Sequence, residues 1–267
     1  MEVEAVSDGA PSLLYGRHPV REVLRSGGRP LEELLILGTG RGPALSEILG
    51  LAASRGVKIS YRTREQLTAI AGSPHHQGVV ARVAEAGYAT LEDLLAIPGQ
   101  RGEQAFFLAL DQVQDPRNLG ALLRTAEAVG VHGVVIPKHR AAGLTGGTAK
   151  AAMGAIEFLP VARESNLVAA LEILKKQGVW LIGSVVTGGT IAWEADLRGP
   201  ICLVLGGEER GLRPLVARTC DLLVSLPMRG RVGSLNVAGA GAVLCYEVLR
   251  QRGMKMEKDL DFKKSKN

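Results

Sequence analysis

The feature that most constrains the fold of this chain is a series of short apolar runs that do not alternate with polar residues. We expect these runs to be strands, at 105–110, 133–136, 179–185, 201–205 and 222–226. Strands that are apolar on both faces are typical of a parallel sheet that helices cover on both sides. The segments between them have helical patterns, at 119–129, 149–155, 167–177, 212–219 and 237–251. The C-terminal part of the chain is therefore predicted to be an α/β domain with a parallel sheet.

The N-terminal part has a second, smaller α/β pattern. It predicts helices at 19–25 and 45–53, strands at 34–37, 57–61 and 78–83, and one more helix that begins with a capping box of Thr63 and Gln66. A looser stretch with Pro98, Gly99 and Gly102 follows. We therefore expect a small domain (1–83), a linker with one short helix (84–104), a larger domain (105–252) and a disordered basic tail (253–267).

Composition and charge exclude several classes of protein. A hydrophobic content of 46% with 22% charged residues indicates a globular chain, and we expect it to be cytoplasmic because no run resembles a membrane span or a signal peptide. Cys202, Cys220 and Cys245 lack the spacing of metal ligands, so we expect buried thiols and no metal site. The net charge of +5 favours a polyanionic partner, although part of the excess lies in the lysine-rich tail.

Three segments of the larger domain, 111–130, 203–212 and 226–247, place glycines and polar side chains where a predicted strand ends. Parallel sheets bind ligands at the carboxyl ends of their strands, so the three segments together predict a site. In the first segment, Asp115 and Pro116 are typical of a helix start. Arg117 and Arg124 lie seven residues apart on one face of that helix. This pair is a phosphate clamp, a surface pair, or a salt bridge to Glu127.

The second and third segments leave alternatives open. In GGEERG, Glu208 and Glu209 lie in a glycine-lined turn, where one carboxylate either caps a helix or binds a ligand. In the third segment, Arg229 and Arg231 form a basic loop, and Ser234 or Asn236 caps a helix of small residues that faces either a ligand or the core. No dinucleotide-binding fingerprint, P-loop or serine elbow is present. In the small domain, His75 and His76 form either an RNA contact or a simple turn.

The sequences DPRNLGALLRTA, LGGEERGL and LPMRGRVGSLNV, in this order, resemble the three motifs of the SpoU (TrmH-like) branch of the SPOUT methyltransferases. The resemblance covers residues 106–252. The segments YGRHPVREVLRSG and HHQGVVARV are similar to the ribosomal-protein-like substrate-binding domain that many members carry. The resemblance implies a deep C-terminal trefoil knot and a homodimer whose sites are completed by the partner.

The same resemblance implies the activity. Members transfer a methyl group from S-adenosylmethionine to a ribose 2′-hydroxyl of RNA, and the chain is most similar to those that methylate a guanosine of large-subunit (23S) rRNA. A tRNA enzyme, a resistance-type rRNA enzyme and a non-catalytic RNA-binding assembly factor are the alternatives. No metal is expected.

Matching the motifs residue by residue implies a set of site residues. The residues expected in catalysis are Asn118, Arg124, Glu208, Ser234 and Asn236. Those expected to hold S-adenosylmethionine are Gly206, Leu226, Ser234, Leu235 and Asn236, with the end of the strand at 179–185 nearby. The residues expected to contact RNA are Arg124, from the first motif, and Arg17, His76, Arg117 and Arg229, from their charge and position.

The family assigns Arg124 the role of the base. Because a guanidinium keeps its proton in proteins, we expect Arg124 instead to hold the substrate phosphate and make the ribose hydroxyl more acidic. Glu208 and Asn118 are expected to position Arg124. The chain departs from the family pattern at Gly233 and at Gly146–Gly147, and both departures concern local contacts with the substrate.

Overall fold

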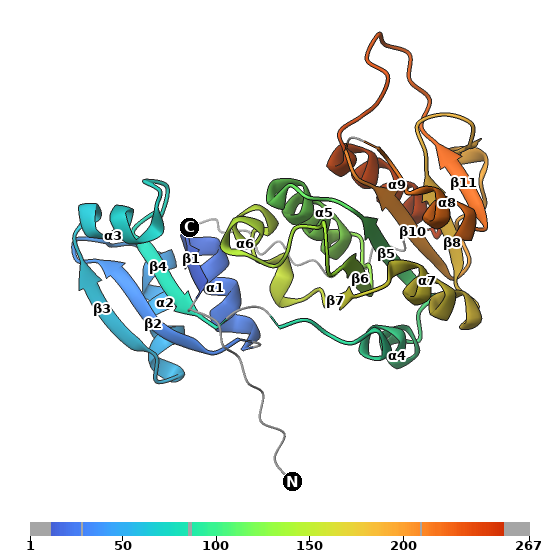
Figure 1. Ribbon diagram of the computed structural model, residues 1–267. Helices are drawn as coiled ribbons and strands as arrows, with labels where there is room; N and C mark the ends of the chain where they lie inside the picture. The colour runs from blue at the N-terminus through green and yellow to red at the C-terminus, as the bar shows by residue number, and fades with distance from the viewer. Residues whose placement is uncertain (1–11, 28, 85–86, 209, 254–267) are drawn as a thin grey trace.

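The computed structural model describes residues 12–27, 29–84, 87–208 and 210–253, and each of its two lobes has its own sheet (Figure 1). Glu209 and residues 254–267 of the predicted tail lie outside the described residues. The first lobe has a four-stranded sheet in the order β1-β4-β2-β3, in which only β2 and β3 run parallel. Its strands are β1 (Ser12–Tyr15), β2 (Leu31–Leu37), β3 (Lys58–Arg62) and β4 (Val79–Val83).

Three helices cover the sheet of the first lobe. The apolar faces of α1 (Arg17–Ser26) and α2 (Pro43–Ser54) form one core with the sheet, and α3 (Arg64–Ala71) packs on the other face through Leu67. The predicted capping box at the start of α3 is confirmed, because Thr63 accepts from the backbone of Gln66 and the Gln66 side chain accepts in return.

The second lobe has a seven-stranded sheet in the order β7-β6-β5-β10-β8-β11-β9, and every strand pair in it is parallel. The parallel sheet that the apolar runs predict is therefore confirmed. Its strands are β5 (Phe106–Asp111), β6 (Gly133–Pro137), β7 (Val161–Glu164), β8 (Trp180–Ser184), β9 (Thr190–Ile191), β10 (Ile201–Gly206) and β11 (Leu222–Ser225).

Helices cover both faces of this sheet, as the continuous apolar strands require. On one face lie α5 (Pro116–Ala128), α6 (Gly146–Ala152), the short η1 (Ala155–Glu157) and α9 (Val237–Gln251). On the other lie α4 (Leu91–Arg101), α7 (Leu167–Lys176) and α8 (Pro214–Thr219). In the described ranges no helix is long and apolar enough to cross a membrane.

The stretch expected to be a linker contributes to the larger lobe. Its helix α4 continues through Pro98 and ends at Gly102, whose φ of 65° is left-handed. Leu91 and Leu94 of α4 are buried against the sheet. A Cβ at Gly133 would lie 2.3 Å from Leu94, so the helix sits closely on β6.

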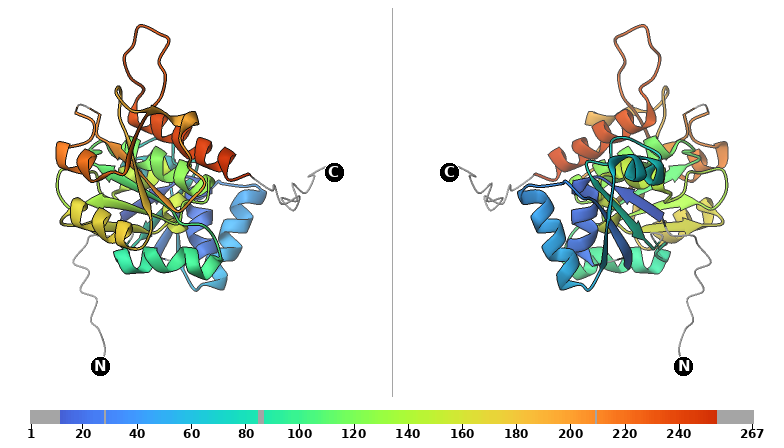
Figure 2. Two further views of the ribbon diagram at one scale, coloured as in Figure 1. Left: turned by 90° about the vertical axis from the view of Figure 1, so that its right-hand side faces the viewer. Right: turned by 90° about the vertical axis from the view of Figure 1, so that its left-hand side faces the viewer.

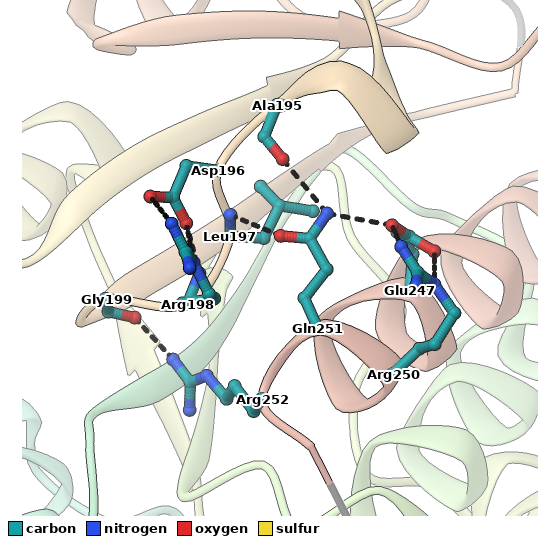
Figure 3. A network of polar contacts seen from close by, with 9 residues as sticks. All are labelled: Ala195, Asp196, Leu197, Arg198, Gly199, Glu247, Arg250, Gln251 and Arg252. Atoms are coloured by element: carbon teal, nitrogen blue, oxygen red, sulfur yellow. Dashed lines mark hydrogen bonds and ion pairs between the residues drawn. The ribbon is translucent and has the colours of Figure 1, made fainter.

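A polar network holds the end of α9 against the segment between η2 (Ala192–Glu194) and β10 (Figure 3). The Gln251 amide donates to the carbonyl of Ala195 and accepts from the amide of Leu197, at 2.9 and 2.8 Å. The Arg252 guanidinium donates to the carbonyl of Gly199. The last helix is thus tied to a strand start from elsewhere in the chain. The trefoil knot that the resemblance implies stays a prediction.

Candidate active site

A cavity of about 650 Å³ opens at the carboxyl ends of three adjacent strands of the larger sheet. Its walls come from 184–187 at the end of β8, from 205–208 and 210–212 at the end of β10, and from residues on the segment after β11 and at the start of α9. The strand-end position is where parallel sheets bind ligands. The second and third glycine-rich segments, and the predicted strand end near 185, therefore meet around one cavity.

The loop after β10 is shaped by contacts that only glycines allow. A Cβ at Gly206 would lie 2.0 Å from the carbonyl carbon of Gly211, and Gly211 itself has a φ of 64°. The amide of Gly207 donates to the carbonyl of Asp111 at 2.8 Å. Backbone atoms, rather than side chains, thus form much of this wall of the cavity.

Asp111 and Arg213 close the same loop, and the sequence analysis missed both. The Asp111 carboxylate is fully buried and accepts from the backbone amide and from Nε of Arg213, at 2.8 and 2.7 Å. A buried carboxylate needs such partners because removing its charge from water is costly. The only signal in the sequence was an acidic residue directly at the end of an apolar run.

The side-chain amide of Asn118 joins all three motifs. Its Nδ2 donates to Oε1 of Glu208, and its Oδ1 accepts from Nδ2 of Asn236 at 3.1 Å. Asn236 in turn begins α9, because its Oδ1 accepts from the backbone amide of Ala238 at 2.8 Å. The structure therefore brings together three of the five residues expected in catalysis.

The residues expected to hold the cofactor lie at the cavity. Gly206, Leu226, Ser234 and Leu235 line it, and Asn236 follows them at the start of α9. Leu235 is 45% exposed although it is apolar. Arg229 is exposed on the same segment between β11 and α9, which extends away from the body of the lobe in every view (Figures 1 and 2).

The two arginines of α5 have different surroundings. Asp115 caps the helix as predicted, and its carboxylate forms a two-point ion pair with Arg117, with Nη2 and Oδ2 at 2.7 Å. The hydrogen bond from Arg117 lowers the pKa of Asp115.

Arg124 is exposed and forms no hydrogen bond or ion pair with the described part of the chain. Arg124 lies almost two turns after Arg117, about 10 Å further along the helix axis. Neither arginine bonds to Glu127.

The two RNA contacts expected in the small lobe differ in exposure. Arg17 is partly exposed and its Nε donates to the carbonyl of Gln77 at 3.3 Å. His76 is 1% exposed. Its Nδ1 accepts from the amide of Gly78 at 3.0 Å, which leaves the proton on Nε2 to be donated to the Thr68 hydroxyl at 3.2 Å. The ring has no surface to offer to RNA, which contradicts the predicted contact, and it serves instead to hold the turn before β4.

All three cysteines are free thiols: Cys202 and Cys245 are buried as expected, whereas Cys220 is only partly buried. Burial raises the pKa of Cys245 to about 12, and burial is also the main cause that raises the pKa of Cys220 to about 12. Such thiols stay protonated and unreactive. Among the residues that the structure describes, no group of three or more His, Cys, Asp or Glu side chains is placed to hold a metal ion.

Comparisons with known proteins identify both lobes. Residues 105–246 match the SpoU rRNA Methylase family, and residues 13–89 match the domain described as RNA 2′-O ribose methyltransferase substrate binding. The chain is 44% identical over 239 residues to the TrmH-family protein YacO of Bacillus subtilis, which covers 90% of this chain and 95% of YacO. It is 41% identical over 243 residues to the 23S rRNA (guanosine-2′-O-)-methyltransferase RlmB of Ralstonia nicotianae, which covers 91% of this chain and 96% of that enzyme.

Comparison of the fold with solved structures also finds a SpoU methyltransferase. The structure of the SpoU methyltransferase AviRb from Streptomyces viridochromogenes, solved with AdoMet, superposes with a TM-score of 0.76 at 25% identity and covers 91% of each chain. The predicted resemblance is thus confirmed over both lobes. The chain belongs to the SpoU rRNA methylase family, the S-adenosylmethionine-dependent RNA 2′-O-ribose methyltransferases.

Proposed function

We propose that the enzyme methylates the ribose 2′-hydroxyl of a guanosine in 23S rRNA. The observation that carries the proposal is the Asn118 link between Glu208 and Asn236 beside the glycine-lined cavity, because it assembles polar groups from all three motifs. The proposed RNA follows the name of the relative from Ralstonia nicotianae, to which the chain is similar over almost the whole length of both. Because the substrate is ribosomal RNA, we expect the enzyme to act in the cytoplasm.

The cavity fits S-adenosylmethionine in size and in lining. Its volume lies within the range of ligand pockets in proteins, about 300–1,000 Å³. Leu205, Leu226 and Val237 offer apolar contacts for a flat base, and the partly exposed backbone at Gly206 offers polar groups. When bound there, S-adenosylmethionine supplies an electrophilic methyl group on a sulfonium.

The residues of the chain then align the RNA and favour removal of the proton from the ribose 2′-hydroxyl. Asn118 and Glu208 hold the loop after β10 against the start of α5, which fixes one wall of the site. Alignment of the ribose oxygen with the methyl carbon supplies much of the acceleration. Arg124 binds the phosphate next to the reacting ribose, and its positive charge favours loss of the 2′-hydroxyl proton to that phosphate or to another acceptor.

A second copy of the chain completes the site in this proposal. Arg124 is exposed and without a partner in the described chain, as expected of a group whose contacts come from elsewhere. Apolar side chains are also exposed on α9, which packs on α5, and on the segment before α9: Val243 is 40%, Tyr246 55% and Val232 71% exposed. These side chains fit a homodimer through the larger lobe. Sedimentation of the wild type and of Tyr246→Asp tests this: the wild type should be a dimer and the variant a monomer.

The small lobe is proposed to grip RNA away from the reacting ribose, through Arg17 and other basic side chains. Phosphate contacts of this kind add affinity and fix the register of the RNA. Arg117 and Arg229 remain in the proposal as contacts from the larger lobe. Because Arg117 is already paired with the Asp115 carboxylate, we expect it to contribute less to RNA affinity than Arg229 does.

The proposed function is tested by methyl transfer from labelled S-adenosylmethionine to purified RNAs. We expect label in 23S rRNA that lacks its native ribose methylations, and none in 16S rRNA or tRNA. Label confined to tRNA would favour the tRNA alternative. Binding of RNA without any methyl transfer would favour a non-catalytic assembly factor.

A further inference from the structure

The segment 146–157, which contains α6 and η1, lies between the two lobes (Figure 1). On one side, Ala149 is 5% exposed within the core of the four-stranded sheet, although it belongs to the larger lobe. Ile156 packs against that core and against the core of the parallel sheet. We call this segment the joint.

A buried ion pair fastens the joint to the small lobe. The side chains of Arg29 and Glu157 are 8% and 3% exposed. Nε of Arg29 donates to Oε2 of Glu157 at 3.2 Å, Nη2 lies 2.9 Å from Oε1, and Nη1 donates to the carbonyl of Ala84 at 3.2 Å. Arg29 comes from the loop between α1 and β2, and Ala84 follows β4, so one guanidinium joins the loop before β2 and the end of β4 to η1.

Two further contacts between the joint and the small lobe restrain rotation about this pair. Nζ of Lys150 lies 4.9 Å from the centre of the Tyr15 ring at the end of β1. Gly154 has a φ of 96°, and a Cβ there would lie 3.2 Å from Cβ of Glu22 on α1. The joint therefore meets the small lobe at β1, at α1 and at the loop before β2. Contacts at three different elements fix the orientation of the small lobe relative to the joint, whereas a single contact would let the lobe rotate.

The opposite side of the joint is packed on the helix that carries the first motif. A Cβ at Gly120 of α5 would lie 2.4 Å from Cβ of Ala151 and 2.7 Å from the carbonyl of Thr148. The two helices therefore touch at backbone distance, and only glycine permits the crossing. Packed interiors of this kind transmit displacement rather than absorb it. The position of the small lobe is thus coupled to α5, which carries Asn118 and Arg124.

We propose that Arg29 and Glu157 are positioning residues for methyl transfer, which fix the small lobe relative to α5 so that RNA held by one lobe delivers one particular ribose to the other. This rests on the proposed RNA methylation. Stability alone explains the pair poorly, because burying two charges costs about as much as their attraction returns, and apolar residues of similar volume often serve as well. An ion pair that includes a directional hydrogen bond between the two lobes does supply what apolar contacts lack, a preferred geometry.

The experiment replaces the pair in the full chain by Arg29→Met with Glu157→Met, which leaves no unpaired buried charge. We expect the affinity for S-adenosylmethionine to stay within about twofold, because the cavity is untouched. The kcat/KM on 23S rRNA should fall about tenfold or more, equivalent to a loss of about 1.4 kcal/mol. Neighbouring riboses should gain methyl groups, and small-angle scattering should show a broader distribution of distances. The matched control is Asp196→Met with Arg198→Met, an exposed ion pair within one lobe that should change none of these.

Two results would overturn the proposal. One is a double variant that modifies the same ribose at the wild-type rate although its scattering has broadened. The other is scattering identical to that of the wild type. If the Met pair does not fold, Arg29→Leu with Glu157→Gln, which also removes the ion pair and leaves no buried charge, takes its place and is judged by the same two readouts. Absence of RNA methylation by the wild type would instead refute the proposed function, and scattering would still report on the joint.

Discussion

Asn118 at the start of α5 and Glu208 after β10 are 90 residues apart in sequence and are joined by a side-chain hydrogen bond. The same Asn118 side chain uses its oxygen to bind Asn236. An amide is suited to this position because it can donate to a carboxylate and accept from another amide at the same time. A carboxylate or an apolar side chain can do only one of these or neither.

The first prediction concerns this link. Asn118→Ala removes a hydrogen bond to a charged group, worth about 1.5–3 kcal/mol, so kcat/KM should fall about 10- to 150-fold. Asn118→Asp should be at least as damaging because it places a second carboxylate beside Glu208. Steady-state kinetics and calorimetry with S-adenosylmethionine are the measurements. Cofactor affinity that fell as far as kcat/KM would show that Asn118 shapes the cavity rather than the RNA side of the site.

A second prediction tests the backbone wall of the cavity. Gly206→Ala should abolish binding of S-adenosylmethionine, because the new methyl would lie 2.0 Å from the backbone of Gly211 and the loop must move. The control is Gly199→Ala, where a Cβ meets nothing within 4 Å. Calorimetry on both variants checks the difference. Normal binding by Gly206→Ala would remove this loop from the cofactor site.

The third prediction separates Arg124 from the cofactor. Arg124→Ala should abolish methyl transfer and leave S-adenosylmethionine binding nearly unchanged, because the exposed guanidinium is proposed to act on RNA. Arg124→Lys should fail as well, since an ammonium cannot bind a phosphate with a planar two-point fork. Single-turnover assays together with calorimetry are required. Equal loss of binding and activity would contradict the assignment.

The fourth prediction is a dependence of stability on pH. Burial, the main cause, lowers the pKa of His76 below the ordinary value of 6.5. The unfolded chain therefore takes up a proton near pH 6.5 that the folded chain refuses, so stability falls as the pH drops below about 6.5. His76→Asn, which can still accept from Gly78, should flatten this part of the profile. Melting temperatures from pH 5.5 to 7.5 are compared with those of His139→Asn, an exposed control; equal slopes in the two variants would exclude His76 as the cause.

Much of the parallel sheet was predictable because its strands are buried on both faces and read as unbroken apolar runs. The strands β7 and β9 were missed for a physical reason. In β7 only Val161 and Ala162 are buried, and β9 has two residues, so neither gives a pattern to detect. The helix α4 was underestimated because Pro98 and Gly99 disfavour a helix locally, and packing of Leu91 and Leu94 overrides that preference.

Part of the site was also predictable, because short polar motifs mark it. Short motifs mark Asn118, Glu208 and Asn236 because each must meet partners at a strand end. No local pattern reveals that Asp111 binds Arg213, 102 residues away, or that Arg29 binds Glu157, 128 residues away. The sequence also does not tell whether a histidine beside a turn faces solvent, and His76 faces the interior.

The enzyme is proposed to place one methyl group on one ribose of 23S rRNA. The most direct test maps ribose methylation across 23S rRNA from cells that lack the protein, before and after incubation with the purified enzyme and S-adenosylmethionine. We predict that one guanosine gains a 2′-O-methyl group with the wild type and none does with Arg124→Ala. A 23S rRNA that gains no ribose methylation, while the enzyme binds the cofactor and is folded, would contradict the proposed activity on 23S rRNA.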